Sequence, residues 1–192
     1  MFKPTTKILA VAVAALAITT GSVQAQTQAI TADVTVQNNL TLAAASNLNW
    51  GSIIAVGDGA QSASLAVSTA GVVGAPSTTG APAVIAIVDS TAESAAQVTI
   101  ADGADGATVN VDIQNVVNPT DGVSNFTLDT FLTSFNGGAD AAQVAGVPFT
   151  IVYDAAFGGG TNTLDIGASI TTASVAFADA AYSGGFDVVF SY

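Results

Sequence analysis

The chain ends on the segment Phe186-Asp187-Val188-Val189-Phe190-Ser191-Tyr192. Successive side chains of a β-strand point to opposite faces of the sheet, so every second residue shares a face. Here one face carries only apolar and aromatic side chains, which are Phe186, Val188, Phe190 and Tyr192. The segment therefore predicts a C-terminal edge strand with one face turned toward a hydrophobic core.

The same alternation recurs near the start of the chain, between residues 30 and 37. Its apolar members, which alternate with Thr, Asp and Gln, are Ile30, Ala32, Val34 and Val36. Two interpretations are open, because alternation alone does not separate them. Both ends are ordinary strands that close one sandwich, or the N-terminal strand is a donor strand that completes the sheet of the next subunit by β-augmentation.

Between these ends, short runs rich in Val, Ile, Thr and Phe alternate with Gly and Asp-Gly turns. Such runs are typical of strands, and helix signals are nearly absent. We expect strands over residues 30–42, 48–54, 60–67, 83–88, 97–101, 108–117, 125–135, 147–153, 163–170, 173–177 and 184–192. The pattern predicts an all-β fold, a single Ig-like or jelly-roll-like antiparallel β-sandwich.

The first 25 residues have the features of a secretory signal peptide. Lys3 and Lys7 form a positive n-region, residues 8–18 are apolar, and Val23-Gln24-Ala25 supplies the small residues of a cleavage site. The apolar stretch is shorter than the about 20 residues of a membrane span. We expect export to the periplasm, the cell surface or the extracellular space, no membrane insertion, and one domain over residues 26–192.

The composition beyond the leader excludes several classes of function. The chain has 14 Asp and Glu, and beyond Lys7 it has no Lys, Arg, His or Cys. This negative charge repels nucleic acids. Nucleophilic triads need a His or Lys base, and zinc sites usually recruit His or Cys. We therefore predict a protein that is not an enzyme, takes no cofactor and has no nucleic-acid partner.

Two features suggest a ligand, and each also has a structural interpretation. Asp102, Asp105 and Asp112 are the metal candidates, since Ca²⁺ prefers several oxygen ligands, but their spacing does not fit an EF-hand and Asp-Gly is a common turn pair. Trp50 is able to stack on a sugar, but a lone Trp in an apolar strand is more often a core anchor. We predict no metal and a core position for Trp50.

Several short segments then suggest a family. Leu48-Asn49-Trp50-Gly51-Ser52-Ile53-Ile54 is similar to an "L-x-F-G-x-I" element, and the segment 164–170 to "L-x-V-G-A-x-L". The segment 182–188 is similar to "Y-S-G-x-F-x-V", and Ala32-Asp33-Val34-Thr35-Val36 opens the mature chain. Together they resemble the exported bacterial family called domain of unknown function 4402, over most of the mature chain. Trp50 stands where that family usually has Phe.

The two alternating ends also resemble pilin subunits of the chaperone–usher type. That resemblance implies an Ig-like sandwich that lacks one strand, with an N-terminal donor strand and a C-terminal aromatic strand. Many such pilins have a cysteine pair, and this chain has none.

These observations predict an exported structural surface protein, a pilus or filament subunit that assembles by β-strand donation. Its partners would be other copies of itself, in a homopolymer, and a periplasmic chaperone. The alternative is a monomeric secreted module that binds carbohydrate or calcium on a self-closed sandwich. An enzyme that uses two aspartates on a glycan is a third hypothesis, for which no motif is present.

Overall fold

A computed structural model describes residues 39–174 and 176–192, which belong to one compact unit, Val36–Tyr192. Antiparallel strands build this part of the chain, with one 3-10 turn, η1 (Phe157–Gly159). No helix among the described residues is long and apolar enough to cross a membrane. The strands are β1 (Thr41–Ser46), β2 (Ser52–Val56), β3 (Ala63–Val67), β4 (Ser77–Thr78), β5 (Val84–Asp89), β6 (Ala96–Ala101), β7 (Thr108–Thr120), β8 (Phe126–Phe135), β9 (Ala141–Gln143), β10 (Phe149–Val152), β11 (Thr161–Thr172) and β12 (Ser183–Ser191).

Strand β11 is the centre of the larger sheet. Its first half pairs with β6 and its second half with β3 along one edge, while β8 pairs with it along the other edge. The sheet continues from β6 to β1, from β3 to β4 and from β8 to β9. Because β1 pairs with β6 alone, it is an edge strand of this sheet among the described residues.

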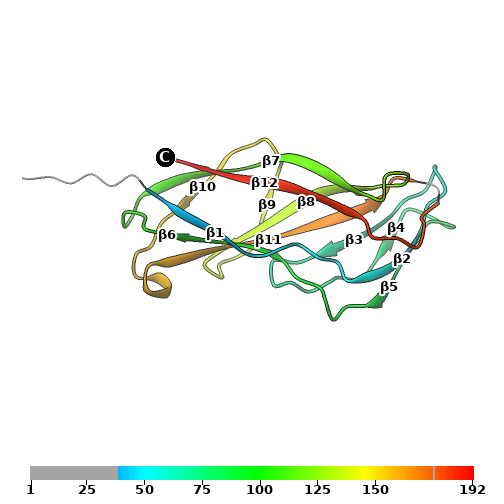
Figure 1. The fold of residues 1–192 in the computed structure, drawn as a ribbon, viewed down its shortest axis with the longest axis horizontal. Coiled ribbons are helices and arrows are strands. Elements are labelled where there is room, and N and C mark those ends of the chain that lie inside the picture. The colour runs from blue at the N-terminus through cyan, green and yellow to red at the C-terminus, as the bar shows by residue number, and fades with distance from the viewer. Residues whose placement is uncertain (1–38, 175) are drawn as a thin grey trace, which may run out of the picture. The chain divides into compact units, whose positions relative to one another are not determined.

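Strand β7 is the centre of a second, three-stranded sheet, with β10 on one side and β12 on the other. Figure 1 shows β7 and β12 running along one side of the unit, with β11, β6 and β3 on the other. Alternate side chains of β7 and β11 fill the space between the layers, and the largest of them are fully buried: Val109, Val111, Ile113, Leu164 and Ile166. Burial of each such side chain contributes about 1.5–3 kcal/mol. The predicted all-β fold, with antiparallel sheets in a sandwich-like arrangement, is confirmed.

Within the described part of the chain, strands β2 and β5 pair only with each other and form a separate two-stranded ribbon. One face of this β2–β5 ribbon packs on the core, where Ile85 is buried and Ile53 and Ala55 are half-buried. An isolated two-stranded sheet is marginally stable in water. The ribbon therefore depends on this packing.

An aromatic cluster closes one end of the sandwich. The ring of Phe126 stacks on Phe177 with centroids 4.5 Å apart, and meets the edge of Tyr182 at 5.3 Å. A separate pair, Phe131 and Phe186, joins β8 to β12 at 5.1 Å. Such pairs contribute about 0.5–1.5 kcal/mol beyond the area that they bury. They fix the position of β12 over the larger sheet.

Most of the predicted strands are present, with shifted ends, and one is wrong. The chain leaves the sheet at Thr172, so the described residues of the predicted strand 173–177 form no strand, and Phe177 instead joins the aromatic cluster. The structure adds the short strands β4 and β9, which we did not predict. The predicted strand 30–42 overlaps β1 only at its end, and its first nine residues lie outside the described part of the chain.

Candidate functional site

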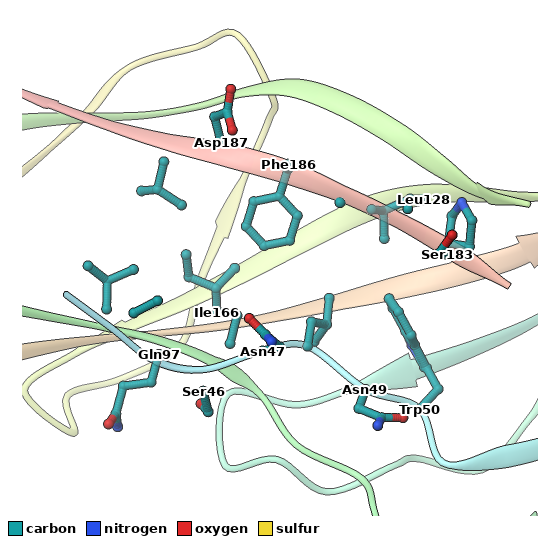
Figure 2. Close-up of a pocket in the computed structure, with 18 of the residues that line it drawn as sticks. Ser46, Asn47, Asn49, Trp50, Gln97, Leu128, Ile166, Ser183, Phe186 and Asp187 are labelled. Carbon is teal, nitrogen blue, oxygen red and sulfur yellow. The ribbon is translucent and has the colours of Figure 1, made fainter. Parts of the chain in front are cut away.

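A groove of about 770 Å³ lies between the free edge of β12 and the free edge of β1. We call it the β12–β1 groove. One wall is the segment from Leu42 to Ile53, which contains β1 and leads into β2, and the other wall is the segment from Tyr182 to Phe190. Residues of β6, β8 and β11 form the floor: Ala96, Gln97, Val98, Leu128, Ile166 and Ile170. Figure 2 shows the opening between the two walls.

The β12 wall of the groove has backbone hydrogen-bonding groups that no described strand pairs with. It pairs with β7 and with no other described strand. Alternate residues of a strand direct their backbone N–H and C=O groups to opposite edges, so about half of these groups on β12 face away from β7. An edge of this kind is a template for a further strand.

The side chains of β12 follow the predicted alternation. Phe186, Val188 and Phe190 are half-buried against the core, while Asp187, Val189 and Ser191 are exposed. In Figure 2, Phe186 points into the groove and Asp187 points away from it. The carboxylate of Asp187 accepts a hydrogen bond from Asn115 Nδ2 at 2.7 Å on that outer face. The β12 wall that faces the groove is therefore apolar.

Tyr192 differs from the other members of the predicted C-terminal face. It follows the last residue of β12, Ser191, and is 52% exposed. It also does not line the groove. The apolar face of the C-terminal strand thus has three members in the described structure, and the prediction for Tyr192 as a fourth is wrong.

The β1 wall of the groove carries mostly small side chains. Every residue of β1 except Ser46 is exposed, and three consecutive residues are alanines, Ala43 to Ala45. These side chains bury little surface of their own, and among the described strands the backbone pairs with β6 alone. Because the wall is thin, another chain segment has room to approach its backbone.

Several apolar side chains that line the groove are incompletely covered. Leu48, Val98 and Trp50 are half-buried and pack against the buried side chains of the core. The indole N–H of Trp50 donates to the carbonyl oxygen of Ala168 at 3.3 Å, and this bond fixes the ring in the lining of the groove. The core position predicted for Trp50 is therefore present, with one side of the residue on the groove.

Polar side chains at the groove bond mainly within the protein. Gln97 Nε2 donates to Asp165 Oδ1 at 2.6 Å, and Asn49 Oδ1 accepts from the backbone N–H of Gly51 at 2.8 Å. No lining residue is a Lys, Arg, His or Cys. The groove thus offers an unpaired backbone edge and apolar surface.

A small hydrogen-bond network anchors the start of β12. Asp121 Oδ1 accepts from the backbone N–H of Ser124 at 2.7 Å and of Val123 at 2.9 Å, and the Ser124 hydroxyl lies 2.9 Å from the Tyr182 hydroxyl. The backbone N–H of Ser124, followed by that of Val123, lowers the pKa of Asp121 below its ordinary value of 3.8. The network ties the β7–β8 turn to the residue that precedes β12.

The three metal candidates do not come together. Asp102 Oδ2 accepts a hydrogen bond from Thr41, and Asp105 Oδ1 accepts from the backbone N–H of Ala155. Asp112 lies within β7, where it is 9% exposed and Gln114 Nε2 donates to its Oδ2 at 2.6 Å. Among the residues that the structure describes, no three His, Cys, Asp or Glu form a group able to hold a metal ion. In the described structure these three aspartates therefore do not form one group of ligands.

The predicted donor residues Ile30, Ala32, Val34 and Val36 lie outside the described residues. Reasoning from the sequence also missed most of the groove, because its parts come from strands far apart in the chain. The segment 48–54 was predicted to be a strand, but no local signal shows that it faces β12. Only the alternation of β12 itself indicated a strand edge.

The comparisons with known proteins add no relative: no protein-family model, curated protein or solved structure matches this chain. The family resemblance therefore stays a prediction, and the groove is the feature of the structure that bears on function.

Proposed function

We propose that this chain is an exported structural subunit that associates with other copies of itself by β-strand donation. In this proposal the β12–β1 groove accepts residues 26–38 of another copy, and the subunit donates its own residues 26–38 in turn. The observation that carries the proposal is the groove, lined in part by apolar side chains, that lies between two strand edges with no partner among the described residues.

The backbone of the groove supports a strand as the ligand. The free edges of β12 and β1 face a common opening, and a strand placed there has N–H and C=O partners to pair with. Main-chain pairing gives affinity in this mode of recognition, and side-chain pockets give specificity. A compact ligand would leave most of these backbone groups unpaired.

The side chains support the same ligand. The half-buried residues of β12 recur at every second position, at Phe186, Val188 and Phe190. The donor segment has the same period of two, at Ile30, Ala32, Val34 and Val36. Two strands side by side in one sheet place such residues on a common face. The donated side chains would cover Leu48, Trp50 and Val98, which line the groove and are only half-buried.

The length of the donor segment is sufficient. Residues 26–38 span about 43 Å when extended, at about 3.3 Å per residue, and the nine residues of β12 span about 30 Å. The donor segment therefore covers the full wall and leaves a few residues as a connection. Before assembly the groove exposes apolar surface and a strand edge, so a periplasmic chaperone that covers it is part of the proposal.

The test replaces two apolar donor residues by acids. In Val34→Asp/Val36→Asp, each new carboxylate would enter an apolar groove, and the chain has no side-chain cation beyond Lys7 to pair with it. Burial of such an unpaired charge costs several kcal/mol. We expect the variant to be monomeric by sedimentation and negative-stain microscopy, under conditions in which the native chain forms polymers.

The matched control is Thr35→Asp, which adds the same charge between the two valines but on the opposite face of the donor strand. We expect this variant to assemble like the native chain. Polymers of unchanged length in Val34→Asp/Val36→Asp would show that these side chains do not enter a groove. A native chain that stays a single-chain monomer at high concentration would favour the alternative, a self-closed binding module.

A further inference from the structure

The outer face of the β2–β5 ribbon is an apolar surface that nothing in the described structure covers. Ile54 and Val56 on β2 face outward, as do Val84 and Ala86 on the neighbouring strand, where Ile54 pairs with Ala86 and Val56 with Val84. Ile54 is 58% exposed, and the two valines are about 40% exposed. Monomeric proteins rarely expose large contiguous apolar patches, and such patches mark interaction sites.

The face carries no charge. β2 has no ionisable residue, and β5 has one, Asp89, at its last position. Asp58, just beyond β2, accepts backbone hydrogen bonds from Ala60 and Gln61, and Asp89 accepts one from Thr91. Both carboxylates are therefore held in the turns that flank the ribbon, and the surface between them is neutral.

This neutrality indicates which partner the surface fits. The formal charge of the chain is −12, and beyond the leader no cation offsets its carboxylates. Two copies therefore repel each other wherever their carboxylates meet. Electrostatic repulsion between two such copies is lowest where an uncharged apolar face forms the contact. A basic partner would instead bind to the acidic part of the surface.

The position of the ribbon agrees with a second copy. The chain passes from the groove into the ribbon without a break, since Trp50 and Gly51 line the groove and Ile53 lines it from within β2. Figure 1 shows the ribbon toward the end of the unit where β12 begins. Because β12 starts at this end, a donated segment that runs antiparallel to β12 leaves the groove here. Docking on the ribbon requires this direction, which brings the rest of the donor's own chain to the ribbon.

The connection between the two contacts is short. Four residues, 37–40, separate Val36 from the first residue of β1, Thr41, and they span about 14 Å when extended. The body of a copy that donates residues 30–36 therefore lies close to the end of the acceptor's groove. A neighbour at that distance contacts whatever surface borders the groove there.

We infer that the outer face of the β2–β5 ribbon is a docking surface for the body of a second copy of this chain. This inference rests on the proposed strand donation, because the donated segment brings the neighbour to the ribbon. The ribbon then provides a second, rigid contact between consecutive copies, in addition to the strand in the groove.

The test uses the absence of cysteine from the chain, so that one introduced thiol reports on one position. Ile54→Cys places a thiol on the outer face of the ribbon, and Val144→Cys is the matched control, since Val144 is also an exposed aliphatic residue, at 68%, and does not line the groove. Each variant is labelled with a maleimide as assembled polymer and as monomer dispersed by dilution. We expect assembly to slow labelling of Ile54→Cys by about tenfold or more, and of Val144→Cys by less than about twofold.

The outcomes separate this inference from the proposed function. If Val34→Asp/Val36→Asp abolishes polymers but Ile54→Cys in native-like polymers labels as fast as in monomers, strand donation stands and the docking surface is wrong. If polymers persist in the double variant and Ile54→Cys is still protected, strand donation is wrong and the docking surface stands. Monomers alone at every concentration would overturn both.

Discussion

At the scale of single residues, Asp121 shows how one half-buried carboxylate supports the groove. Its carboxylate accepts hydrogen bonds from two backbone N–H groups in the turn between β7 and β8. The hydroxyl of Ser124, in the same turn, is hydrogen-bonded to the hydroxyl of Tyr182, which precedes β12. Tyr182 also bonds the backbone of Ala178, at 3.0 and 3.3 Å. One turn residue therefore helps to hold both the β7–β8 turn and the chain that enters the groove wall.

The stability that Asp121 contributes depends on pH. Its pKa is lowered in the folded protein, so the ionised form stabilises the fold above the ordinary value of 3.8, and this contribution is lost as pH falls through the lowered pKa. We predict that Asp121→Ala lowers Tm at neutral pH and that the difference from the native chain shrinks as the pH falls below 3.8. Thermal unfolding followed by circular dichroism across this range measures it.

Asp121→Asn is the control for that experiment, because its amide oxygen still accepts hydrogen bonds but does not titrate. The Tm difference between the Asn and Ala variants should therefore stay nearly constant with pH. A difference between the native chain and Asp121→Ala that is equally large below and above 3.8 would contradict the assignment.

At the scale of elements, the start of β12 depends on a close approach to β7. A Cβ on Gly184 would meet the carbonyl oxygen of Val117 and lie 2.6 Å from the backbone nitrogen of Pro119, whereas a Cβ on Gly185 meets nothing within 4 Å. Only a glycine lets β12 lie this near to β7 at position 184. That contact fixes the position of the β12 wall of the groove.

We predict that Gly184→Ala destabilises the fold by about 1–3 kcal/mol, the usual cost of overpacking against a rigid neighbour. Gly185→Ala is the matched control and should change stability by less than about 0.5 kcal/mol, as surface substitutions usually do. Urea unfolding of both variants measures the free energies. Equal stability of the two variants would show that β12 does not approach β7 as closely as described.

The elements also show what local sequence predicts and what it does not. The alternation of β12 predicted both its strand and its buried face, because a strand with one dry face leaves a period of two. β1 was placed too early, since its three alanines have low strand propensity and form a strand only through pairing with β6. β4 and β9 have two and three residues, too few for any pattern, and their partners alone define them.

The groove and the ribbon face were not predictable for a related reason. Each of their residues was visible as part of an apolar run, but the side chains that share the groove come from β1, β6, β8, β11 and β12. Their meeting depends on sheet order, which a period of two does not specify. Sequence spacing likewise did not show that Asp112 lies within β7, apart from the turn that holds Asp102 and Asp105.

At the scale of the whole molecule, the proposed function raises one central question, which is whether a strand from another copy or from the same chain occupies the groove. β1 and β12 run in opposite directions along it (Figure 1). If residues 30–36 turned back onto β1 of their own chain, they would form a hairpin antiparallel to β1 and parallel to β12. A strand from another copy has no such restriction. Self-closure and donation therefore predict different connections between the same two segments.

One measurement distinguishes them directly. Val34→Cys is combined in the same chain with Phe186→Cys, Val188→Cys or Phe190→Cys, so that one of the three acceptor positions lies opposite residue 34 in any register that shares their face. Neighbouring residues on paired strands are close enough for a disulfide. We predict that oxidised polymers of at least one of these variants run as a ladder of covalent multimers on a non-reducing gel. Disulfides confined to single chains would contradict strand donation between copies.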